Sequence, residues 1–143
     1  MSEMPPLSQE NRPGTESRSV TTIWLPPEVT ALTTARQSAR EVAAQVRDEV
    51  VDAIELVVSE LVTNSVKHAS LEPGDRIQLV AERSRDQIRI EVWDAGPGFE
   101  PSKPQSTVLM RPSGWGLYLV DRLSDRWGTI REAGMRVWSE FDL

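Results

Sequence analysis

The chain has 143 residues, which is enough for a single domain with its own hydrophobic core. It carries 16 basic and 22 acidic side chains, and the resulting net charge of -6 argues against binding to a nucleic-acid backbone. Cysteine is absent, which excludes disulfide bridges, thiolate zinc sites and cysteine nucleophiles. No run approaches the roughly 20 apolar residues of a membrane helix, so we expect a cytoplasmic protein with neither signal peptide nor membrane anchor.

The first 19 residues differ in composition from the rest of the chain. Residues 1–19 are rich in Pro, Ser, Glu and Arg and poor in large apolar side chains, which is typical of a flexible tail. We therefore expect one domain over residues 20–143. Its first element is a short edge strand from Val20 to Leu25, because β-branched and aromatic residues are followed there by Pro26 and Pro27.

Two amphipathic helices are predicted next. Apolar residues recur at spacings of three and four in both, with a break near Arg47 and Asp48 and an end at about Ala69. The first stripe consists of Val29, Leu32, Ala35, Ala39, Val42, Ala43 and Val46. The second stripe consists of Val50, Val51, Ile54, Val57, Val58, Leu61 and Val62.

The second half of the chain changes to a period of two. Alternating residues predict a β-hairpin over 77–82 and 88–93, followed by a long, proline-containing loop over 95–113 of the kind that is usually functional. A third helix is expected to start around Trp115 to Gly116, and a last hairpin covers 127–131 and 135–141. This order predicts an α+β two-layer sandwich, with three helices on one face of a mostly antiparallel sheet.

The second predicted helix contains a polar motif. Glu60, Asn64 and Lys67 fall within about 60° of one another on a helical wheel. A solvated face would explain any one of them, but Thr63 and Asn64 are poor helix formers and indicate a specific contact. The three groups suit a nucleotide, because an amide oxygen can bind Mg²⁺, a carboxylate can accept a proton and an ammonium can contact a phosphate.

The second motif is Asp94-Ala95-Gly96-Pro97-Gly98, at the end of a predicted strand. A simple turn explains it equally well. Its position nevertheless suits base recognition, because the carboxylate of Asp94 can accept from the exocyclic amine of adenine. Gly96 and Gly98 would let the backbone approach the ligand closely.

The third motif is Ser113-Gly114-Trp115-Gly116-Leu117, which ends the long loop and opens the third predicted helix. Unpaired backbone N–H groups at a helix N-terminus bind anions such as phosphate. A flexible hinge is an equally good explanation of the two glycines. A Rossmann fingerprint and a Walker P-loop are excluded, because the further glycines or the Gly-Lys-Ser/Thr ending that they require do not occur here.

Taken together, the three motifs resemble the N-box, G1-box and G2-box of the GHKL ATPases, over about residues 20–143. The stretch 116–128 and the later Val137-Trp138 are similar to the small anti-sigma-factor serine/threonine kinases of actinobacteria. The resemblance implies an ATP-binding (Bergerat) fold with ATP and Mg²⁺ as cofactors. It also implies phosphorylation of an anti-sigma-factor antagonist, sequestration of a sigma factor and homodimerisation. The alternative is a non-catalytic regulator that uses ATP to order its lid and hold a partner.

The resemblance also implies a role for each motif. Glu60 would be the general base, Asn64 the Mg²⁺ ligand, Lys67 a phosphate contact and Asp94 the adenine reader. The nucleotide would further contact Gly96, Gly98, Ser113, Gly114, Trp115, Gly116 and Leu117. Residues 99–113 would form the ATP lid, from which Arg111 would reach the γ-phosphate. The chain departs from the family in its short lid and at Arg136, where relatives often carry Thr, and this substitution is expected to alter the hydrogen bonding around adenine.

Overall fold

The structure, a computed structural model, describes residues 17–97 and 112–143, of which 112–116 only as backbone. Eight elements follow one another as β1, α1, α2, β2, β3, α3, β4 and β5. The strands are β1 (Ser19–Leu25), β2 (Ile77–Arg83), β3 (Gln87–Asp94), β4 (Arg126–Arg131) and β5 (Met135–Asp142). The helices are α1 (Ala31–Val42), α2 (Asp48–His68) and α3 (Pro112–Leu123).

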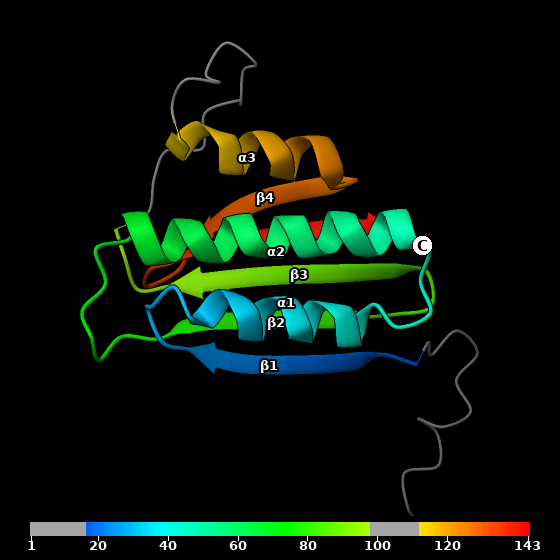
Figure 1. Ribbon diagram of the computed structural model, residues 1–143, viewed down its shortest axis with the longest axis horizontal. Coiled ribbons are helices and arrows are strands. Elements are labelled where there is room, and N and C mark those ends of the chain that lie inside the picture. The colour runs from blue at the N-terminus through cyan, green and yellow to red at the C-terminus, as the bar shows by residue number, and fades with distance from the viewer. Residues whose placement is uncertain (1–16, 98–111) are drawn as a thin grey trace, which may run out of the picture.

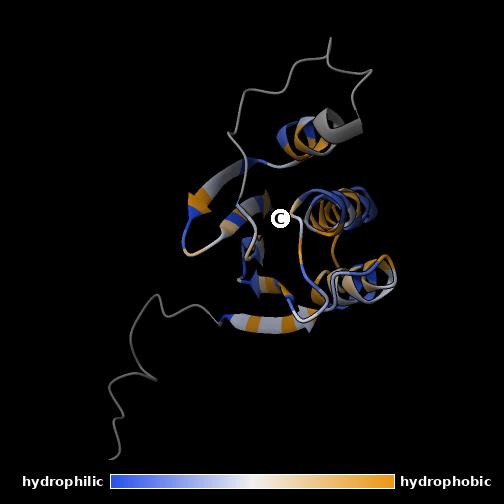
Figure 2. Cartoon of the chain, turned by 90° about the vertical axis from the view of Figure 1, so that its left-hand side faces the viewer, coloured by the Kyte–Doolittle hydropathy of each residue, from blue (hydrophilic) through white to orange (hydrophobic). Residues whose placement is uncertain are grey.

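The five strands form one sheet in the order β1-β2-β3-β5-β4, and every neighbouring pair is antiparallel. All three helices lie on the same face of this sheet, as Figure 1 and the end-on view in Figure 2 show. The predicted α+β two-layer sandwich is therefore confirmed. The first strand lies at an edge, as its two following prolines predicted, and β4 forms the other edge.

Two helix boundaries differ from the prediction. α1 is shorter than its apolar stripe, because Val29 lies before the helix with 64% of its surface exposed and Gln45 has a left-handed φ of 66° beyond its end. A left-handed residue cannot continue a right-handed helix, so placing Val46 in α1 was wrong. α3 begins at Pro112, three residues earlier than expected, because proline at a first helical position loses no hydrogen bond.

The hydrophobic core lies between the sheet and the helices. Alternate residues of β2, β3 and β5 are buried, as the period of two predicted, and α2 crosses them with its apolar stripe. In Figure 2 hydrophobic residues recur along both the strands and the helices that enclose this core. The largest fully buried side chains include Phe141, Leu25, Ile54, Leu61, Ile77, Leu79, Ile88 and Ile90.

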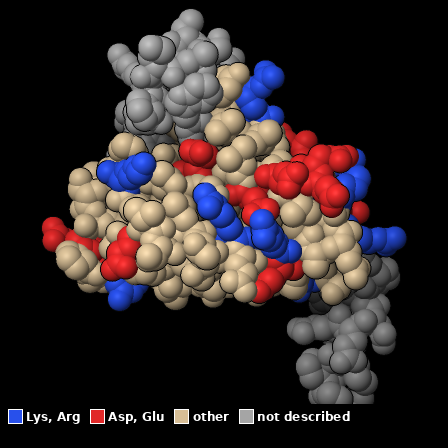
Figure 3. All heavy atoms as spheres, in the orientation of Figure 1, with Lys and Arg blue, Asp and Glu red and all other residues tan. Residues whose placement is uncertain are grey.

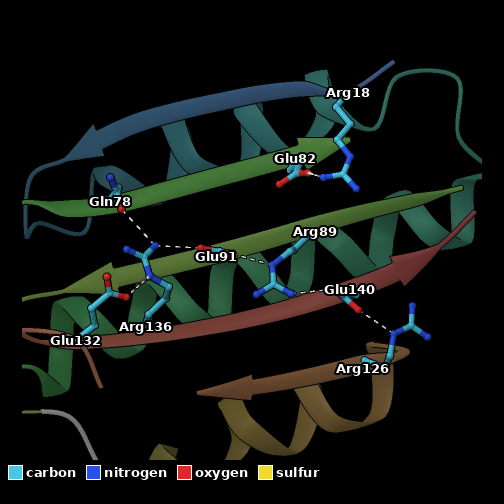
Figure 4. A network of polar contacts seen from close by, with 9 residues as sticks. All are labelled: Arg18, Gln78, Glu82, Arg89, Glu91, Arg126, Glu132, Arg136 and Glu140. Atoms are coloured by element: carbon cyan, nitrogen blue, oxygen red, sulfur yellow. Dashed lines mark hydrogen bonds and ion pairs between the residues drawn. The ribbon is translucent and has the colours of Figure 1, made fainter. Parts of the chain in front are cut away.

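The opposite face of the sheet carries a network of charged side chains (Figure 4). Arg89 on β3 donates to Glu91 and to Glu140, each at 2.7 Å, and Arg126 on β4 donates to the other oxygen of Glu140 at 2.8 Å. Arg136 on β5 donates to Glu91 at 3.0 Å. The network therefore joins β3, β5 and β4 across their solvent-facing side.

Candidate functional site

The site is centred on Asp94, the last residue of β3. Its side chain is on the helix-facing side of the sheet and only 8% exposed. The hydroxyl of Ser65 on α2 donates to Oδ2 of Asp94 at 2.6 Å, and the backbone N–H of Gly96 donates to Oδ1 at 2.9 Å. A buried carboxylate needs such donors to offset the loss of water. Each oxygen accepts from one donor within the described part of the chain, and each has a further lone pair for a ligand.

The loop after Asp94 is packed against the end of α2. A Cβ atom on Gly96 would be 2.6 Å from the carbonyl oxygen of Ala69 and 3.0 Å from Oδ1 of Asp94. Ser70, which follows the helix, has a left-handed φ of 54°, as is typical where a helix ends. Glycine is therefore required at position 96 for close approach to the end of α2, whereas the predicted close approach to a ligand remains a prediction.

The N-box residues lie on one flank of α2. The other flank contacts α1, where Arg36 donates to Ser59 at 2.7 Å and Arg40 pairs with Glu55 at 2.9 Å. On the helical wheel, Glu60, Asn64 and Lys67 lie away from this contact, toward the side that faces α3. Glu60 and Asn64 are half-buried and Lys67 is exposed. Among the described residues none of the three has a hydrogen-bond or ion-pair partner, which distinguishes them from Glu55.

The glycine motif lies inside α3 rather than ahead of it. Because the helix begins at Pro112, residues 113–117 belong to its first two turns, whereas the motif was expected to end the loop and open a helix that starts around Trp115 to Gly116. The first backbone N–H groups of any helix lack partners within it, so an anion site at this end remains a prediction. Leu117 is half-buried. The side chains of Ser113 and Trp115, and all of Gly98 and Arg111, lie outside the described residues.

Arg136 does not approach Asp94. It lies on the solvent-facing side of β5 and pairs with Glu91, whereas Asp94 is on the helix-facing side. The expectation that it alters hydrogen bonding around adenine was therefore wrong, because alternate residues of a strand point to opposite faces. The β5 residue opposite Asp94 on the helix-facing side is Met135, which is 3% exposed.

Ser65 and Met135 lie at Asp94 but were not predicted from the sequence. A signal for Ser65 was present, because it is a polar residue on the sheet-facing stripe of α2, and a buried hydroxyl in such a stripe needs a partner. Met135 carried no comparable signal, since an apolar residue at the start of a strand is ordinary. Met135 belongs to the surroundings of the site only because it pairs with Asp94 in the sheet.

A separate cavity of about 370 Å³ lies at the opposite end of α2. Val50, Ala53, Leu123, Phe141 and Leu143 contribute to its lining, and no residue of the three motifs does. It is therefore distinct from the site at Asp94. On the helix-bearing face, basic and acidic side chains are interspersed rather than gathered into a basic surface (Figure 3).

Comparison with known families agrees with this geometry. The family described as histidine kinase-like ATPase domain matches residues 25–140, which include the whole of α2, β3 and α3. The chain belongs to this family. The resemblance to GHKL ATPases drawn from the three motifs is thus confirmed.

The chain is also similar to individual curated proteins. The serine-protein kinase RsbW of Staphylococcus aureus strain bovine RF122 / ET3-1 is 31% identical over 99 residues, which cover 61% of this chain and 62% of the relative. The kinases of the same name from strains MRSA252 and JH9 match with the same identity and coverage. The chain therefore matches a little less than two thirds of the length of these relatives. Within the described residues, no helix is both long and apolar enough to cross a membrane.

Proposed function

We propose that this chain binds ATP with Mg²⁺ and transfers the γ-phosphate to a serine or threonine of a small protein partner. The observation that carries the proposal is Asp94, a buried carboxylate held at both oxygens beside the free polar flank of α2. Its spare lone pairs are acceptors for the exocyclic amine of adenine. The membership in an ATPase family and the similarity to serine-protein kinases support the same activity.

The residues present are compatible with Mg²⁺ bound together with a nucleotide. The described residues contain no group of three or more His, Cys, Asp or Glu side chains that could hold a metal ion. Mg²⁺ commonly takes one or two protein oxygens and completes its coordination with phosphates and water. The amide oxygen of Asn64 would be such a ligand, and Lys67 would contact a phosphate. Bound Mg²⁺ would supply neutralisation of the phosphate charge.

Glu60 would act as the general base. Its carboxylate would accept the hydroxyl proton of the substrate serine or threonine as that oxygen bonds to the γ-phosphorus, while the bond to the leaving ADP oxygen breaks. Glu60 is suited to this role because it is half-buried and makes no ion pair with the described residues. Glu55 on the opposite flank forms an ion pair with Arg40 instead.

The partner follows from the family resemblance. We propose that the substrate is an anti-sigma-factor antagonist and that the chain, as a homodimer, sequesters a sigma factor when the antagonist is phosphorylated. A net charge of -6 is compatible with regulation of transcription through protein contacts rather than through DNA.

Phosphate transfer tests the proposed activity. The protein is incubated with γ-labelled ATP and candidate antagonist proteins from the same genome, and the partner is expected to become labelled. Glu60→Ala should bind ATP but leave the partner unlabelled. Glu55→Ala, on the same helix but on the α1 flank, is the matched control and should still transfer phosphate. Binding of ATP without transfer by the wild type would instead identify the non-catalytic regulator.

A further inference from the structure

Ser65 on α2 makes a hydrogen bond to the site that is not needed to form the helix itself. It is 4% exposed and lies on the sheet-facing stripe of α2, among apolar neighbours such as Leu61 and Val62. Its hydroxyl donates to Oδ2 of Asp94 at 2.6 Å, and the two residues lie 29 positions apart in the sequence, on α2 and β3. A hydrogen bond to a charged acceptor at this distance is stronger than one between neutral groups.

The two donors on Asp94 approach from different structural elements. Ser65 belongs to α2, whereas the N–H of Gly96 belongs to the loop after β3. With one donor on each oxygen, rotation of the carboxylate about its Cβ–Cγ bond is fixed. The remaining lone pairs therefore have fixed directions. Among the described residues, removal of Ser65 would leave the carboxylate with the Gly96 contact alone, which holds one of its two oxygens.

We propose that Ser65 is the positioning residue that gives this site its preference for a 6-aminopurine. The inference rests on the proposed ATP binding and adds the origin of base selectivity. An amine donor at C6 finds an oriented acceptor in Asp94, and hydrogen bonds weaken steeply when their alignment is poor. A site built to accept from a substrate N–H discriminates strongly against analogues that lack it.

The test compares two nucleotides that differ only at C6. Calorimetry measures the binding of ATP and of purine riboside triphosphate, which has hydrogen in place of the amine, to the wild type and to Ser65→Ala. The wild type should prefer ATP by at least about tenfold, as expected for one oriented hydrogen bond in a buried site. In Ser65→Ala, ATP affinity should fall about tenfold while affinity for the analogue stays unchanged. The ratio of the ATP affinity to the analogue affinity therefore approaches one.

Two further variants separate positioning from stability. Ser59→Ala removes another buried serine of α2, one that contacts Arg36 and not Asp94, and it should leave the ratio at the wild-type value. Ser65→Cys keeps nearly the same volume but has a weak donor, so it should lower the ratio even if Ser65→Ala does not fold.

The outcomes are distinguishable. Equal loss of affinity for both nucleotides in the Ser65 variants, with a lower melting temperature, would mean that Ser65 only stabilises the fold, and would overturn the inference. An unchanged ratio would overturn it too. If the wild type binds neither nucleotide, the proposed function itself is wrong and the inference falls with it.

Discussion

Gly96 lies so close to the end of α2 that a Cβ atom on it would be 2.6 Å from the carbonyl oxygen of Ala69. The same Cβ would also be 3.0 Å from Oδ1 of Asp94, whose other oxygen is bound by Ser65. The helix end, the loop and the carboxylate therefore form one packed unit. A displacement of any of its three parts moves the others.

Gly96→Ala is expected to weaken ATP binding by at least tenfold. The added methyl group must displace backbone, and overpacking of this kind costs about 1–3 kcal/mol. Calorimetry with ATP and thermal unfolding together measure the effect. Gly74→Ala is the matched control, because a Cβ there meets nothing within 4 Å, and it should change neither quantity appreciably. Wild-type affinity in Gly96→Ala would show that the site does not depend on this packing.

Asp94→Asn is expected to abolish most ATP binding while leaving the fold intact. The N–H of Gly96 can only donate a hydrogen bond, so the amide oxygen would stay on it. The amide nitrogen would then lie against Ser65, whose hydroxyl oxygen can accept a hydrogen bond. The acceptor that Oδ2 offers to the base is then replaced by a donor, which costs about 1–3 kcal/mol. ATP titration and circular dichroism measure the two effects. Retained preference for ATP over GTP would contradict the role of Asp94.

Gly134→Ala is expected to lower the free energy of unfolding by about 2 kcal/mol or more, because residue 134 combines positive φ with close packing. Its φ is 145°, and a Cβ there would overlap the backbone oxygen of Asp94. The preceding Ala133 has a left-handed φ of 50°, so Ala133→Gly should stabilise instead. Urea unfolding of both variants checks the opposite signs, and effects of equal sign would refute the explanation.

The charged network should make stability depend on pH. Hydrogen bonds from Arg126, and then from Arg89, lower the pKa of Glu140 below its ordinary value of 4.5. A carboxyl group whose pKa is lower in the folded state than in the unfolded state stabilises the fold. This stabilisation is complete at pH values above the unfolded-state pKa and is lost as the pH falls through the folded-state pKa.

Glu140→Gln should therefore be less stable than the wild type at pH 7, by about 0.5–1 kcal/mol for a half-buried network, and the gap should close as the pH falls below the ordinary pKa of 4.5. Urea midpoints across this range measure it. Glu49→Gln is the control, since that side chain is 77% exposed and lies 3.6 Å from Arg47. A gap that is independent of pH would exclude the ionic explanation.

The parts of the fold with a clear period could be predicted from sequence. Alternation gave β2, β3 and β5 to within a residue or two, because one face of the sheet is buried and the other is charged. Boundaries set by single backbone conformations could not be predicted, as Gln45 beyond α1 shows.

The same distinction applies to the residues of the candidate site. Asp94 and Gly96 were predicted as site residues from the spacing of their motif, and the structure leaves no room for a side chain on Gly96 beside Ala69. The position of Arg136 was misjudged, since the face of a strand on which a residue lies depends on register with its neighbours. The polar Ser65 on an apolar stripe indicated that it needs a partner, but that this partner is Asp94, 29 positions away, is known only from the structure.

The place of β5 in the sheet has a consequence for synthesis of the protein. Although β5 is the last of the five strands in sequence, it pairs with β3 on one side and β4 on the other. As the chain leaves the ribosome, β1, β2 and β3 can associate. The other edge of β3 stays unpaired until residues 135–142, which form β5, have emerged. Nascent chains shorter than this should bind chaperones and be cleaved readily by proteases, and protection should arise abruptly once β5 has emerged.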